Sequence, residues 1–303
     1  MARSTVSVTI DRIRRQLSSG YRNEINTLAS AVLSTDTSIT LSYALTPNVA
    51  VGAMLSVGIE LMRVVAVDEA AKTVTVIRAF HDSTAAAHNA GTEVWINSRF
   101  TGLDIYDAML EEIGSYGPQL YQVVTEELTV ADSQETVELP VSMAGCYGII
   151  DAHRQWTDVG STTQSTAWPR ANVRLVRYDP SAWSAFSTSG LALRFIDPVA
   201  AGKVIVKAAI PYHTTFGVGQ DLITHGGLQE SMLDVLSMGI RLRLLQANEA
   251  GMSARTTQDE PRRAQEVPPG SLVQQGQVSQ ALYRNRKMEE INKLRSLYPV
   301  RFG

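Results

Sequence analysis

Residues 203–210 read KVIVKAAI, and this stretch decides how the middle of the chain folds. Its small and apolar side chains occupy every second position, at Val204, Val206, Ala208 and Ile210. Alternation with a period of two is typical of a β-strand that buries one face, whereas a helix repeats every three or four residues. The stretch therefore predicts a half-buried strand.

Five earlier runs in the same region are also short and rich in β-branched residues. They are LYQVVTEELTV (120–130), TVELPV (136–141), YGIIDAHRQW (147–156), NVRLVRYD (172–179) and LALRFI (191–196). Gly, Pro, Ser and Asp separate these runs, as is usual for turns between strands. Short strands in succession, with no helical pattern between them, predict a β-sandwich over residues 119–216.

A second strand-rich region comes earlier in the chain. Its runs are SITLSYAL (38–45), MLSVGIELMRVVAV (54–67), KTVTVIRAF (72–80) and TEVWINS (92–98). They predict a small antiparallel β domain, a sheet or a barrel, over residues 36–100.

Helical patterns flank both β regions. Residues 11–33 carry apolar side chains at three- and four-residue steps, which predicts that the N-terminal segment 1–35 is helical. Residues 101–118 predict a short connecting helix, and residues 217–251 a long amphipathic helix. The fold class is therefore α+β, with a small β unit, a β-sandwich and long helices.

The last part of the chain has two segments of different character. Residues 252–276 are polar and contain Pro261 and the Pro268-Pro269-Gly270 run, which predicts an extended C-terminal arm. Residues 277–303 predict a basic helix that ends at Pro299.

Composition excludes several function classes. The chain has 303 residues, 44% of them hydrophobic, and a net charge of −3, so no global attraction to nucleic acid or to an anionic membrane is expected. Its single cysteine, Cys146, excludes an intrachain disulfide framework. No apolar run is long enough to span a bilayer, and the N-terminus has no signal-peptide pattern, so we expect synthesis in the cytoplasm and no membrane partner.

The polar stretch HDSTAAAHNAGTEVW, residues 81–95, is the first candidate for chemistry. His81 and His88 are seven residues apart, and no glutamate lies between them in the pattern of a helical zinc site. Asp82 and Ser83 before three alanines instead predict a capped helical turn between two strands. We expect the histidines to hold a loop.

Other candidates are equally weak. Cys146 is expected to be a buried structural thiol, and GVGQDL at 217–222 a hinge rather than a phosphate loop, with Asp221 near the helix start. Asp151 and His153 share a strand face and could form a hydrogen bond, but they lack a third polar partner. We predict no catalytic residues, no cofactor and no metal site, and hence no enzyme.

Aromatic residues of the sandwich allow a second interpretation. Trp156, Trp168, Tyr178 and Trp183 surround its predicted loops. Buried, they anchor the loops; exposed, they would stack on sugars.

The C-terminal segment has the clearest bias toward binding. It combines basic and apolar side chains, and the candidate docking residues are Leu282, Tyr283, Arg284, Arg286, Lys287, Ile291, Leu294, Arg295, Tyr298 and Phe302. A basic amphipathic helix can dock on a partner protein, another subunit or DNA phosphates, or it can be a solvated helix face with its own Glu–Lys pairs. Both interpretations remain open at this point.

Two segments together resemble known proteins. KTVTVIRAFHDSTAAAHNAGTEVWI, residues 72–96, resembles a β-hairpin element of tailed-phage virion proteins, with Arg78 on the strand, Ser83 to His88 in the turn and Ala90 to Val94 on the return strand. The long helix, the arm rich in Arg, Pro and Gln, and the helix that closes on LRSLYPVRF are similar to head-to-tail connector (adaptor) proteins of siphophages infecting actinobacteria.

This resemblance implies a structural protein of the virion neck. It implies a homo-oligomer, a dodecameric ring, that docks on the portal protein through the C-terminal arm and helix. Stopper or tail-completion proteins, and the major capsid protein, are further implied partners, and genomic DNA would pass through the lumen without sequence-specific binding. Alternatives are another virion component (a stopper, a baseplate hub or a minor capsid protein) or a carbohydrate-binding β-sandwich module.

Overall fold

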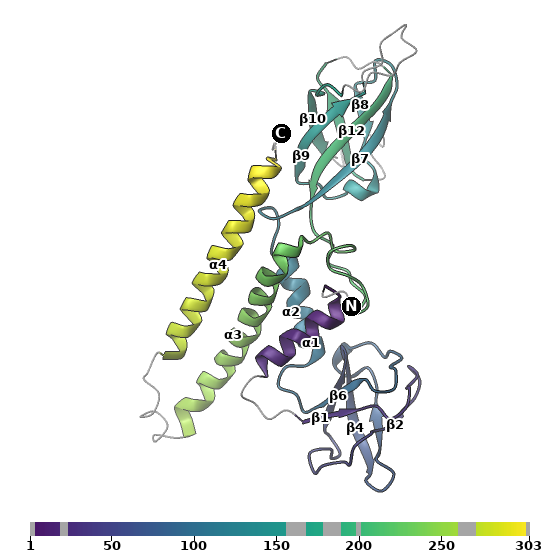
Figure 1. Ribbon diagram of the computed structural model, residues 1–303, viewed down its shortest axis with the longest axis vertical. Helices are drawn as coiled ribbons and strands as arrows, with labels where there is room; N and C mark the ends of the chain where they lie inside the picture. Colours follow the sequence, from purple (N-terminus) through teal and green to yellow (C-terminus); the bar gives the residue numbers. More distant parts are fainter. Residues whose placement is uncertain are drawn as a thin grey trace. The chain divides into compact units, whose positions relative to one another are not determined.

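The computed structural model describes residues 4–18, 24–155, 168–177, 189–197, 201–259 and 271–300, with backbone alone for 247–259 and 271–275. The chain forms two compact units, each built from two separate stretches of sequence (Figure 1). Unit 1 comprises Met1–Ile113 and Thr214–Asn285, and unit 2 comprises Gly114–His213 and Arg286–Gly303. The fold is α+β, as the sequence predicts.

Unit 1 contains a six-stranded antiparallel sheet. In the order β1-β6-β3-β4-β5-β2, its strands are Glu24–Thr27, Glu93–Ile96, Met54–Val57, Glu60–Asp68, Thr73–Ile77 and Ser38–Thr40. A bridge between Leu28 and Leu41 brings the ends of the two edge strands together, so the sheet curls around an apolar core. This is the small β domain predicted for residues 36–100, with one strand more at its N-terminal side.

Helices complete unit 1. They are α1 (Val6–Leu17), α2 (Gly102–Gly114), α3 (Leu233–Asp259) and the first part of α4 (Ser271–Leu297). The buried side chain of Arg14 links α1 to the curled sheet, because its guanidinium donates to the Gly58 carbonyl at 3.0 Å and lies 5.1 Å from the centre of the Trp95 ring.

Unit 2 is a sandwich of two three-stranded sheets. One has the order β10-β11-β8 (Val173–Arg177, Leu191–Phe195, Thr136–Glu138), and the other β7-β12-β9 (Gln122–Val130, Gly202–Ile210, Gly148–Arg154). The stretch KVIVKAAI lies in β12, the central strand, and its four alternating side chains are all buried in the core between the sheets. Because one face of β12 is buried, its apolar residues alternate in the sequence, and this alternation correctly predicts the strand.

Two predicted helical features are wrong in detail. The helix predicted over 11–33 ends at Leu17, and Glu24–Thr27 pairs with β6 instead. The helical turn predicted after Ser83 is replaced by a short 3-10 turn at Phe80–Asp82, with extended backbone at Ser83. Tertiary pairing outweighs local propensity at both places.

The C-terminal half also differs from prediction. Helix α3 begins at Leu233, so Asp221 lies well before it and caps a turn by accepting the backbone N–H groups of Ile223 and Thr224. The predicted arm over 252–276 is helical up to Asp259 and again from Ser271; the part between them is outside the described residues.

Candidate functional site

Glu60 is the centre of the polar cluster that the stretch 81–95 helps to form. Its side chain is fully buried at the start of β4 and accepts a bidentate ion pair from Arg78, with Nε at 2.6 Å and Nη2 at 2.7 Å. His88 Nε2 lies 2.8 Å from the second carboxylate oxygen, and the Ala86 N–H donates to the same oxygen at 3.1 Å. The buried carboxylate is thus saturated with donors.

The guanidinium of Arg78 extends this cluster to the loops around it. Besides Glu60, it donates to the backbone carbonyls of Leu33, Asp36 and Ala86 at 2.7–2.9 Å. Burial alone would raise the pKa of Glu60, but the hydrogen bonds from Arg78, His88 and Ala86 outweigh it and lower the pKa to about 2. A carboxylate that is ionised at neutral pH and accepts four donors suits a structural role, and His88 holds the loop as the sequence predicts.

A second cluster lies on β9 in unit 2. His153 Nε2 is 2.7 Å from Asp151 Oδ2, which confirms the predicted hydrogen bond, and Arg170 Nε lies 3.0 Å from Asp151 Oδ1. Burial would raise the pKa of Asp151, but the interactions with His153, Arg170 and the Ala152 N–H together outweigh it and lower the pKa. Arg170 is the third polar partner that sequence reasoning missed, since it comes from a different segment.

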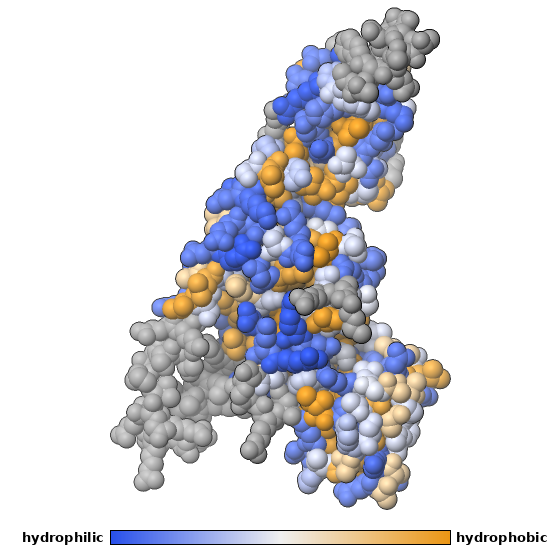
Figure 2. All heavy atoms as spheres, viewed as in Figure 1, coloured by the Kyte–Doolittle hydropathy of each residue, from blue (hydrophilic) through white to orange (hydrophobic). Residues whose placement is uncertain are grey.

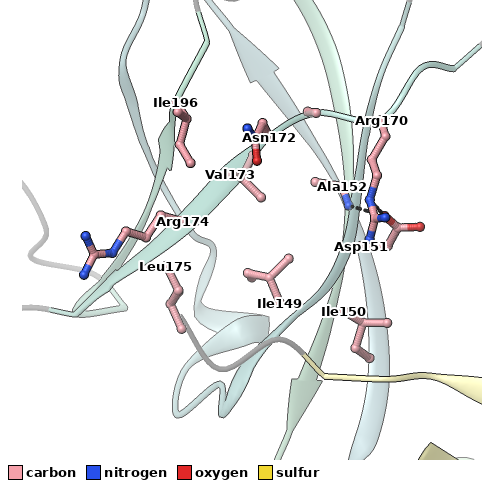
Figure 3. Close-up of a pocket in the computed structure, with 11 residues that line it drawn as sticks. Ile149, Ile150, Asp151, Ala152, Arg170, Asn172, Val173, Arg174, Leu175 and Ile196 are labelled. Carbon is pink, nitrogen blue, oxygen red and sulfur yellow. Dashed lines mark hydrogen bonds and ion pairs between the residues drawn. The ribbon is translucent and has the colours of Figure 1, made fainter. Parts of the chain in front are cut away.

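Beside this cluster the sandwich surface is hollowed. A pocket of about 380 Å³ lies between β9 and β10, and in Figure 3 Ile149, Val173, Leu175 and Ile196 surround it. The side chain of Arg174 points away from β10 at one end of the hollow (Figure 3). Among the described residues that line the pocket there is no Ser, Thr, Cys or Lys. Cys146 is fully buried in the core, and burial raises the pKa of its thiol.

A third cluster joins three helices of unit 1. Glu112 of α2 is almost fully buried; Arg243 of α3 donates to its Oε2 at 2.7 Å, and the Tyr283 hydroxyl of α4 donates to its Oε1. Burial and the neighbouring carboxylate both raise the pKa of Tyr283. Gly239 of α3 faces the same carboxylate, and a Cβ there would lie 2.4 Å from Glu112 Cδ. The close approach of α2 and α3 therefore requires glycine at this position.

The candidate docking residues divide into two groups along α4. Ile291 and Leu294 are buried in the chain itself, and Tyr283 is bonded to Glu112. The side chains of Arg286 and Lys287 also have partners within the chain, Glu290 at 2.7 Å and the Tyr116 ring at 5.0 Å. These residues anchor the helix.

Three of the remaining candidates lie on the outer surface of the helix. Leu282, Arg284 and Arg295 are exposed, and Tyr298 is half-buried; its carbonyl accepts the Tyr121 hydroxyl at 2.5 Å. Phe302 lies outside the described residues, as do Trp156, Tyr178 and Trp183 of the predicted aromatic group, whereas Trp168 is half-buried.

Exposed apolar side chains accompany the exposed candidates on α4. Val278, Leu282 and Leu297 are about 60% exposed, and Met288 is 48% exposed. Hydrophobic surface is visible near the beginning of the helix (Figure 2). Arg284, Met288 and Arg295 have the spacing i, i+4, i+11, so they share one stripe of the helix.

The described residues contain no group of three or more His, Cys, Asp and Glu side chains placed to hold a metal ion. None of the described helices is both long and apolar enough to cross a lipid bilayer. A scan against protein-family models and a search of curated proteins found no match to the sequence.

Proposed function

We propose that this chain is a structural protein of the tailed-phage virion neck, a head-to-tail adaptor without a catalytic step. Copies of it would form a ring that docks on the portal protein and connects the capsid to the tail, with the DNA passing through the lumen. The resemblance of residues 72–96 and of the C-terminal helices motivates this proposal.

Helix α4 is the observation that carries it. One face of the helix is fixed to the chain by Tyr283, Ile291 and Leu294, while the opposite faces keep large apolar and basic side chains in water. Exposed apolar side chains beside charged ones are typical of a protein-binding surface. An anchored helix is also preorganised, which lowers the entropic cost of docking.

The test is binding to isolated portal rings. Residues 277–303 should not simply be deleted, because Ile291 and Leu294 are part of the core and their loss would unfold more than the docking surface. A triple variant that changes only the exposed stripe, Arg284→Glu with Met288→Asp and Arg295→Glu, avoids this problem.

We expect this variant to bind portal at least about tenfold more weakly while its circular dichroism stays that of the wild type. Arg63→Glu with Lys72→Glu is the control, since both side chains are exposed and its change in net charge, −4, is close to the −5 of the triple variant. Equal binding by wild type, triple variant and control would contradict docking through α4.

A further inference from the structure

The two long sides of the sandwich in unit 2 carry opposite charge. Strands β9 and β10 form one side, which holds the pocket, and β7 and β8 form the other (Figure 1). Strands β8 and β10 are the edge strands of one sheet, and β7 and β9 those of the other. Residues 169–171, just before β10, bridge the end of β9 through backbone hydrogen bonds to Ala152 and Arg154.

The β7–β8 side is purely acidic. Residues 120–139 contain five carboxylates and no lysine or arginine: Glu126, Glu127, Asp132, Glu135 and Glu138. Lys203 of β12 pairs with Glu127 at 2.6 Å, and Arg194 of β11 is 3.9 Å from Glu135. Counted with Lys203 and Arg194, this side has five carboxylates against two basic side chains.

The β9–β10 side is basic. Residues 147–155 and 168–177 carry four arginines against the single carboxylate of Asp151. Arg174 lies directly opposite Arg194 across the β10–β11 pair, and both are exposed. Like charges in this cross-strand position repel each other; Arg194 has Glu135 at 3.9 Å, and an anionic partner would give Arg174 a counter-ion as well.

We propose that the β9–β10 side of one copy docks on the β7–β8 side of a second copy of this chain. Opposite charges on opposite sides of one domain fit a head-to-tail contact, which generates a ring when the rotation between copies closes. The apolar pocket between β9 and β10 would supply the dry centre of the contact, with Arg170 and Arg174 among the residues that line it. This inference rests on the proposed ring and identifies the surface that builds it.

Two charge-reversed variants test the contact. Arg174→Glu with Arg177→Glu changes the basic side, and Glu126→Lys with Asp132→Lys changes the acidic side. Sedimentation velocity of the full chain at about 0.05 M and about 0.5 M NaCl measures self-association. We expect the wild type to associate more weakly at the higher salt concentration, and each variant alone to associate at least about tenfold more weakly than the wild type.

An equimolar mixture of the two variants is the decisive sample. Each variant then offers a side complementary to the other, so mixed oligomers should form although neither variant assembles alone. Lys72→Glu, an exposed change in unit 1, should associate like the wild type. Conservative versions, Arg174→Gln with Arg177→Gln, guard against a folding defect because they remove the charges without reversing them.

Three results would overturn the inference: a wild type that stays monomeric, variants that assemble like the wild type, or a mixture without mixed species. The last two would indicate that the charges serve only to keep strand edges from aggregating. Portal binding through α4, measured on the same proteins, separates this failure from failure of the adaptor function. If the chain binds portal but the charge-reversed variants self-associate like the wild type, the adaptor function stands and only this interface is wrong.

Discussion

At the scale of single residues, the buried carboxylate of Glu60 explains the role of the polar stretch around His88. Sequence reasoning considered His81 and His88 as a pair, but the partner of His88 is a carboxylate 28 residues earlier in the chain. His81 instead packs its ring edge-on to Phe80, with centroids 4.4 Å apart. The polar residues of the stretch therefore hold the backbone around a buried ion pair.

Replacing Glu60 should destabilise unit 1 strongly. In Glu60→Gln the guanidinium of Arg78 keeps its burial but loses its counter-ion, and such losses cost about 3–5 kcal/mol. Urea unfolding measures the effect, with the exposed Glu69→Gln as control. A change below about 1 kcal/mol would mean that the cluster contributes little to stability.

Acid should unfold unit 1 through the same carboxylate. The folded pKa of Glu60, about 2, lies below the unfolded value, so the stabilisation is complete above the unfolded value of about 4.3 and is lost as the pH falls toward 2. The difference corresponds to roughly 3 kcal/mol. Thermal melts between these pH values should show a steep loss of stability in the wild type and a shallower one in Glu60→Gln. The same loss of stability with falling pH in both proteins would show that Glu60 is not the group responsible.

At the scale of elements, prediction succeeded where the pattern is local. The alternation in β12 indicated a strand, and the strand is the buried centre of its sheet. Prediction failed where contacts between distant parts of the chain determine the structure. Residues 24–27 continue a helical pattern in the sequence, but they pair with β6 as a strand. The Glu112–Arg243 pair joins residues 131 apart. No single-sequence periodicity contains such contacts.

Gly239 tests the packing of α2 on α3. Gly→Ala inside a helix normally stabilises it by up to about 1 kcal/mol. At Gly239 the new Cβ would meet the Glu112 carboxylate, so we expect Gly239→Ala to destabilise the protein by about 1–3 kcal/mol.

Gly276 provides the matched control for this substitution. It lies in α4 with no heavy atom within 4 Å of the position of a Cβ, so Gly276→Ala should be neutral or stabilising. Thermal unfolding of both variants measures the contrast. If Gly239→Ala, like Gly276→Ala, left the stability unchanged or raised it, α2 and α3 would not approach closely at Gly239.

At the scale of the whole molecule, the proposed function combines two surfaces of this chain. The exposed stripe of α4 would bind the portal, and the charged sides of the sandwich would bind neighbouring copies. Neither surface was predictable in full from the sequence, because separating anchoring from exposed residues on α4, and acidic from basic strand edges, requires the fold. The candidate docking residues were chosen from composition, and the fold keeps Leu282, Arg284 and Arg295 as exposed members.

Electron-microscopic imaging of isolated portal rings incubated with this chain is the most direct test of the proposed docking. We expect class averages with an additional closed ring of this protein on the portal, dodecameric as the resemblance implies. Portals without added density, in the presence of excess folded chain, would contradict it.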